Sequence, residues 1–151
     1  MTAESTSAPE TTWKCVIVVD GALPRGLVAN AAAVLGAAIG ARVPDLLGPD
    51  VADAAGHSHA GLLSSPMPIL TAEASDLATL VARLRHEARR TAGDALLFIP
   101  FTDCAQRERT YPGYVARLAA TNPQTLQYLG VALCAERRLV ARHTGNFKLL
   151  R

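Results

Sequence analysis

Three uninterrupted apolar runs constrain the fold of this chain more than any other feature of its sequence. They lie at Val16–Val19, Leu96–Ile99 and Leu129–Val131, and segments with helical patterns separate them. A strand that is apolar at consecutive residues is covered on both faces, whereas a half-exposed strand alternates. Together with a short strand at 68–71, these runs predict an α/β three-layer sandwich, in which helices cover both faces of a mostly parallel four-stranded sheet.

The length of 151 residues predicts one domain. The polar residues at 1–12 lack the basic start and apolar centre of a signal peptide, so we expect a disordered tail ahead of a single α/β domain at 13–151. Within this domain, residues 42–67 are rich in proline, glycine, aspartate and histidine. We therefore expect a long inserted loop there.

Charge, hydropathy and cysteine usage exclude several classes of protein. The net charge of +2 indicates no basic surface large enough for nucleic-acid binding. The longest apolar stretch, Leu27–Ala41, is too short and too rich in alanine and glycine to span a membrane. Cys15, Cys104 and Cys134 are odd in number without Cys-x-x-Cys spacing, so we expect neither a disulfide framework nor a zinc ribbon. These features favour a cytoplasmic protein without membrane or nucleic-acid partners.

Polar residues at two strand ends form the candidate ligand site. The turn at 24–26 opens a helix, so backbone donors and one guanidinium are free to hold an anion. Asp20 ends the first strand, and Thr102 with Asp103 ends the second; ligand crevices of open α/β sheets lie at such ends. Asn30 either faces this crevice or holds a neighbouring loop. The predicted ligand-binding residues are Asp20, Arg25, Gly26, Asn30, Thr102 and Asp103.

The two ends of the chain resemble type II peptidyl-tRNA hydrolases. The first end is a strand followed by the turn Leu-Pro-Arg-Gly-Leu at 23–27 and a helix of small residues. The second is the closing pattern Thr-Gly-x-x-Lys-Leu at 144–149. The chain is even more similar to an uncharacterised bacterial family that shares this hydrolase fold, in which the 23–27 turn and a Gly-Pro-Asp loop recur together. This resemblance implies the fold and a homodimer, but no established activity.

The resemblance also implies which residues correspond to those that the hydrolases use. Arg25 stands where the family has a basic residue, but Leu27 replaces the lysine that follows it. The family's Asp-Ala-Gly turn corresponds to residues 103–105, which leaves Asp103 as the candidate catalytic residue. An arginine keeps its proton at neutral pH, and a partly solvated aspartate is a weak base. We therefore expect no appreciable hydrolysis of peptidyl-tRNA.

His57 and His59 are the weak candidates for metal binding. In an extended segment both rings lie on one side, and Asp50 and Asp53 are close in sequence. The spacing indicates no third ligand, so we expect ordinary surface histidines, no bound metal and no cofactor.

Three functions stay open. The first is binding of a small anionic ligand at the strand ends. The second is hydrolysis of an ester or amide such as peptidyl-tRNA, with Arg25 binding charge and Asp103 orienting water. The third is a structural homo-oligomer, assembled through the alanine-rich helix or an open sheet edge. Binding of tRNA requires several basic contacts, so the near-neutral chain favours the first.

Overall fold

The computed structural model describes residues 13–93 and 95–151, so the predicted tail at 1–12 lies outside the described residues. No helix within these two ranges is long and apolar enough to cross a membrane. The strands are β1 (Trp13–Asp20), β2 (Val51–Ala52), β3 (Ser58–His59), β4 (Ile69–Ala72), β5 (Leu96–Thr102), β6 (Tyr128–Glu136) and β7 (Lys148–Leu149). The helices are α1 (Arg25–Arg42), α2 (Ala74–Arg90), α3 (Asp103–Arg107), α4 (Tyr111–Ala120) and α5 (Arg137–Thr144), with short 3-10 turns η1 (Pro44–Leu46) and η2 (Pro123–Thr125).

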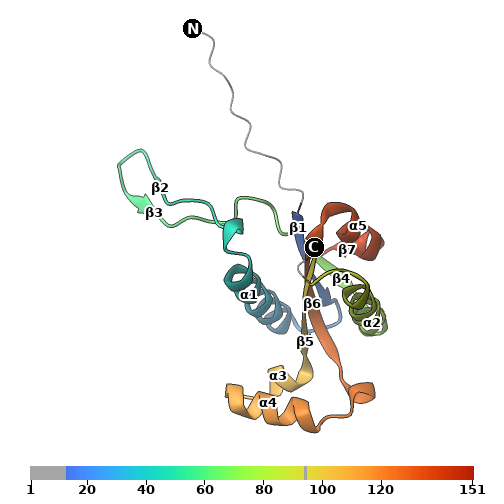
Figure 1. Cartoon of the computed structure of the whole chain (residues 1–151). Coiled ribbons are helices and arrows are strands. Elements are labelled where there is room, and N and C mark those ends of the chain that lie inside the picture. The colour runs from blue at the N-terminus through green and yellow to red at the C-terminus, as the bar shows by residue number, and fades with distance from the viewer. Residues whose placement is uncertain (1–12, 94) are drawn as a thin grey trace.

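The main sheet has five strands and is mostly antiparallel. Its order is β5-β6-β1-β4-β7, in which β1 and β4 are the parallel neighbours. β6 runs antiparallel to both β1 and β5, and β7 runs antiparallel to β4. The prediction of a mostly parallel four-stranded sheet is therefore wrong. The prediction of an α/β protein with helices against the sheet is confirmed (Figure 1).

The connection between β5 and β6 explains why the sheet is mixed. A parallel neighbour requires a crossover that returns along the face of the sheet. Residues 103–127 instead form α3, α4 and η2 beyond the strand ends, below the sheet in Figure 1, so the chain re-enters the sheet at the end it left. The three apolar runs lie in neighbouring strands, and β6, between β5 and β1, runs antiparallel to both.

The core has two halves because β1 is apolar on both faces. Figure 1 shows α1 on one face of the sheet and α2 with α5 on the other. Successive residues of a strand point to opposite faces, so Ile17 and Val19 pack with α1, whereas Val16 and Val18 pack with α2. The buried side chains of α1 are Val28, Ala31, Leu35 and Ile39, and those of α2 are Leu77, Leu80, Val81 and Leu84.

Residues 43–68, here called the arm, project from the end of α1. The pair β2 and β3 stands clear of the sheet (Figure 1), whereas Val43, Leu46 and Met67 at the base pack against the core. They include η1 and the antiparallel pair β2 and β3, and a bridge between Leu47 and Leu63 closes the base. The tip turns at Gly56, whose φ of 85° favours glycine. The segment for which the sequence predicts an inserted loop is therefore a hairpin with its own hydrogen bonds.

A disulfide joins Cys15 of β1 to Cys134 of β6. The two residues face each other directly in the antiparallel register, with their Cα atoms 4.1 Å apart. Cys104 is free and buried. The sequence predicted no disulfide framework and gave no sign of this single bond, because an odd count of cysteines does not prevent one pair from meeting across two strands.

Candidate functional site

The predicted strand-end residues lie at one end of the strands of the sheet but do not surround one cavity. β1 and β5 run in the same direction, so Asp20 and Thr102 lie at the same end of the sheet, with β6 between the two strands. The Asp20 carboxylate accepts a hydrogen bond from the backbone N–H of Ala22 at 2.9 Å, which holds the turn before α1. Arg25 and Gly26 are exposed, and Arg25 makes no hydrogen bond or ion pair with any described residue. The turn thus leaves this guanidinium in solvent.

Asp103 has structural contacts on both carboxylate oxygens. Oδ1 accepts a hydrogen bond from the backbone N–H of Gln127 at 3.3 Å, and the Asp103 N–H donates to the Gln127 carbonyl at 2.9 Å. Oδ2 lies 3.3 Å from a guanidinium nitrogen of Arg107. These contacts tie the start of α3 to the residues before β6.

Thr102 and Asn30 differ in their surroundings. Thr102 is buried, and its hydroxyl has no hydrogen-bond partner in the described part of the chain. The Asn30 side chain donates a hydrogen bond to the side-chain amide oxygen Oε1 of Gln106 at 3.1 Å and so joins α1 to α3. Asn30 thus makes the contact with a neighbouring segment that the sequence left open, and it also lines the groove along α1.

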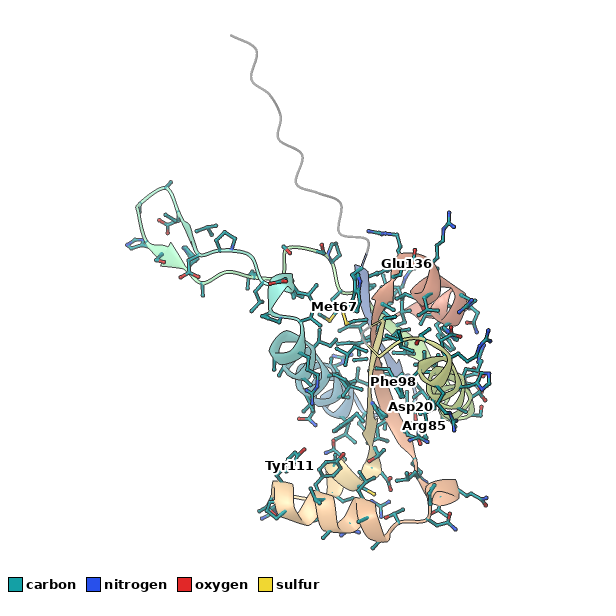
Figure 2. All side chains as sticks on the ribbon, viewed as in Figure 1. Asp20, Met67, Arg85, Phe98, Tyr111 and Glu136 are labelled. Atoms are coloured by element: carbon teal, nitrogen blue, oxygen red, sulfur yellow. A yellow bond between two sulfur atoms is a disulfide. The ribbon has the colours of Figure 1, made fainter. Side chains whose placement is uncertain are left out.

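A groove runs along α1, between this helix, the sheet edge at β5 and the α3–α4 segment. Its volume is about 740 Å³, within the range of about 300–1,000 Å³ that is usual for ligand pockets. Tyr111 is the first residue of α4 and lies below α1 in the view of Figure 2. The wall that α1 contributes is a stripe with a spacing of four residues: Asn30, Val34, Ala38 and Arg42.

The groove carries an excess of positive charge. Arg42 and Arg109 line it, and Glu108 is the carboxylate among its lining residues. Glu108 is already paired with Arg117 through a hydrogen-bonded ion pair. Arg109 makes no hydrogen bond or ion pair with a described residue. The uncompensated charge in the groove is therefore cationic.

Two tyrosines supply an aromatic wall with hydroxyl groups. The Tyr111 and Tyr114 rings meet edge to face, with centroids 5.6 Å apart. Burial, with smaller effects of Tyr111 and Cys104, raises the pKa of Tyr114 above its ordinary value of 10.0, so its hydroxyl stays a donor at neutral pH. Of the groove residues, Asn30 is among those predicted from the sequence, whereas the arginines and tyrosines are not. The spacing from Asn30 to Arg42 along one helix face was the available signal.

A second cavity, of about 640 Å³, lies at the carboxyl ends of β1 and β4 and is acidic. Asp20, Glu73 and Asp76 line it, together with Lys148. Three carboxylates against one ammonium repel an anion. Of the two cavities near the predicted site, the groove along α1 is therefore the better place for an anionic ligand.

The two histidines of the arm are bound to the same aspartate. Asp53 Oδ2 lies 3.1 Å from His57 Nδ1 and 3.2 Å from His59 Nε2. These hydrogen bonds, with that of His59 the largest contribution, lower the pKa of Asp53 below its ordinary value of 3.8. Within 13–93 and 95–151, no group of three or more histidine, cysteine or acidic side chains is arranged to hold a metal ion.

His143 is a buried titratable group that the sequence analysis did not identify. Its side chain packs between α5 and α2, and the residue is 6% exposed. Glu87 Oε2 lies 3.7 Å from its Nε2, while Glu87 Oε1 pairs with Arg142 at 3.0 Å. Burial, and then the charge of Arg142, hold the pKa of His143 below its ordinary value of 6.5.

We expect the free energy of unfolding to decrease as the pH falls below 6.5, because His143 takes up its proton in the unfolded chain first. The contribution of neutral, buried His143 to stability is complete above its pKa in the unfolded chain. It is lost as the pH falls from that value to the lower pKa of His143 in the folded protein. Urea denaturation at a series of pH values measures it. His143→Gln should flatten the slope in this window, whereas His86→Gln, at an exposed position of α2, should keep it. A stability that stays level through the window in the native protein contradicts this prediction.

The fold and the groove define an α/β protein with a mixed five-stranded sheet and one basic groove along its edge strand. The chain belongs to the family described as "Protein of unknown function (DUF2000)", which matches residues 13–151. A solved structure of the protein of unknown function Atu0240 from Agrobacterium tumefaciens strain C58 is similar: its TM-score is 0.83 at 18% identity, and the match covers 94% of this chain and 100% of that one. No curated protein matches the sequence. These comparisons establish the family and the fold.

Proposed function

We propose that the protein binds a small anionic ligand with an apolar body in the groove along α1. The observation that carries this proposal is the free guanidinium of Arg109, in a groove whose carboxylate is already paired. Arginine holds a carboxylate or phosphate through two parallel hydrogen bonds, which suits an anion at this position. Arg42 adds a second positive charge at the α1 wall.

The remaining lining of the groove suits the apolar body of the ligand. Leu97 and Ile99 of β5 and Val34 of α1 contribute apolar surface, and the tyrosine pair contributes an aromatic face. The linked amides of Asn30 and Gln106 supply further polar groups for orienting a ligand. The proposed site includes Asn30, as does the site expected from the sequence. It lies in the groove along α1, whereas the expected site included the turn that contains Arg25.

Titration with phenyl phosphate, followed through backbone amide resonances, tests the proposal. We expect shifts at the groove residues, and Arg109→Gln should weaken binding by about tenfold or more, since hydrogen bonds to charged groups contribute about 1.5–3 kcal/mol. Phenol, which lacks the charge, should bind more weakly than phenyl phosphate. Arg25→Gln is the matched control, because it removes an exposed arginine outside the groove and should leave binding unchanged.

The two arginine variants also decide between the possible sites. If Arg25→Gln abolishes binding and Arg109→Gln does not, the anion lies at the turn before α1 and the groove proposal is wrong. If phenyl phosphate shifts no groove resonance at millimolar concentration, the proposal fails as well.

We also propose that the fold is related to that of type II peptidyl-tRNA hydrolases. The turn at 23–27 and the closing pattern at 144–149 support this relation. The hydrolase activity itself has less support, because Asp103 is engaged by Arg107 and Gln127 and because Leu27 replaces a lysine of that family. We therefore favour ligand binding over catalysis.

A further inference from the structure

The small net charge of the chain conceals two oppositely charged surfaces. α2 and α5 lie together on one face of the sheet (Figure 2), and their seven arginines against Asp76 and Glu87 give them a formal charge of +5. The arm contains Asp45, Asp50 and Asp53 and neither lysine nor arginine, which gives it a formal charge of −3 with neutral histidines. We call the outer arginines of the two helices the basic face. They are Arg83, Arg85, Arg89, Arg90, Arg138 and Arg142.

Val43, Leu46 and Met67 at the base of the arm pack against the core, and several contacts within the arm give its outer part a defined shape. The Asp53 carboxylate accepts hydrogen bonds from the backbone N–H groups of Ala55 and His57 at the tip. Nearer the base, the Gly61 N–H donates to the Asp50 carboxylate at 2.9 Å. A Cβ at Gly61 would collide with the carbonyl oxygen of Gly48, so the two strands of the arm approach closely there. The arm is therefore an ordered hairpin with its own hydrogen bonds.

The arm also exposes apolar side chains that nothing in the described chain covers. Leu62 is 81% exposed and Val51 is 60% exposed, and Leu47 and Leu63 at the base are exposed too. An ordered segment that combines exposed leucine and valine with acidic charge suits a protein surface that is basic and has aliphatic character. The arginines of the basic face have this character, because their stems present methylene groups beside the guanidinium.

We propose that the chain self-associates, with the acidic arm of one copy lying across the basic face of a second copy. The arm projects on the α1 side of the sheet, whereas the basic face is on the α2 side, so the arm does not reach the basic face of its own chain (Figure 1). Arg83, Arg90 and Arg138 make no hydrogen bond or ion pair with a described residue and are available to the carboxylates. Two such contacts related by a two-fold axis close a dimer.

The test uses the full chain and two variants that remove one partner surface each. The arm variant replaces its three aspartates by asparagine, which keeps an acceptor oxygen for the hydrogen bonds inside the arm: Asp45→Asn, Asp50→Asn and Asp53→Asn. The face variant removes the unpaired arginines: Arg83→Gln, Arg90→Gln and Arg138→Gln. A matched control removes the same charge elsewhere: Arg25→Gln, Arg107→Gln and Arg151→Gln.

Sedimentation velocity at micromolar concentration measures the association. We expect the native protein and the control to be dimeric at about 50 mM salt, with a dissociation constant that rises at least about tenfold at about 500 mM salt, because salt screens the paired charges. The arm variant and the face variant should each sediment as monomers. A native protein that is monomeric at low salt, or a dimer that persists in both variants, overturns the proposal.

Mixing the two variants tests which surfaces meet. The arm variant keeps a basic face and the face variant keeps an acidic arm, so an equimolar mixture should form a heterodimer through one arm–face contact. Association of arm with arm, or of face with face, would give no such rescue and would overturn the proposal. A native protein that stays monomeric but binds heparin through the basic face would assign this face to a polyanion instead.

Discussion

Reduction of the Cys15–Cys134 disulfide is expected to lower the free energy of unfolding by about 2–4 kcal/mol. The bond joins residues separated by 119 positions, so it restricts a large part of the unfolded chain. In the folded protein its loss is tolerated, because the backbone ladder between β1 and β6 holds the two strands together on either side. Urea denaturation with and without a thiol reductant measures the difference.

Cysteine variants supply the controls for this result. Cys15→Ala/Cys134→Ala should already have the lower stability, and the reductant should then have no effect. Cys104→Ser should keep the full effect of the reductant, since Cys104 takes no part in the bond. Equal stability of the native protein in oxidising and reducing buffer would show that the two cysteines are not joined in solution.

Leu35→Ala is expected to lower the free energy of unfolding by about 2–5 kcal/mol. Leu35 is 1% exposed at the centre of α1 and packs directly over Gly130 of β6. A Cβ placed on Gly130 would lie 3.2 Å from Leu35 Cδ1, so the leucine occupies the space that a larger residue in the strand would need. With no side chain at Gly130 to fill the gap, the truncation leaves a cavity between helix and sheet.

Gly130→Ala tests the contact from the opposite side. In the native background the added methyl group crowds Leu35 Cδ1 at 3.2 Å and the Val18 carbonyl oxygen at 3.1 Å, and we expect a loss of about 1–3 kcal/mol. In the Leu35→Ala background the same methyl group enters the vacated space. The double variant should therefore be more stable than the sum of the single changes predicts. Additive effects would contradict a direct contact.

The positions of the central strands were readable in the sequence because burial leaves a local pattern. β1, β5 and β6 contain the three continuous apolar runs, and the buried residues of α2 repeat at helical spacing: Leu77, Leu80, Val81 and Leu84. Both patterns depend on the period of the backbone and on which faces are covered, so a short window of residues contains them.

The direction of β6 depended on the path of the chain outside the sheet. A buried strand is apolar whichever way it runs, so the apolar run at Leu129–Val131 does not indicate the direction of β6. The course of residues 103–127, beyond the strand ends instead of across a sheet face, made the strand antiparallel. The same register placed Cys15 opposite Cys134, a pairing that their spacing in sequence does not indicate.

The sequence by itself determined the class of fold, the buried strands and helix faces, and one groove residue, Asn30. The tertiary structure alone decided the rest of the groove, because Arg42 lies on α1 while Arg109 and the two tyrosines come from the α3–α4 segment. It also decided where charge gathers, since a net charge of +2 is the same whether opposite charges mix or separate. The hydrophobic period of a segment indicates which of its residues are buried. The groove, in contrast, is formed by contacts between segments that are distant in sequence, and these contacts depend on the path of the chain.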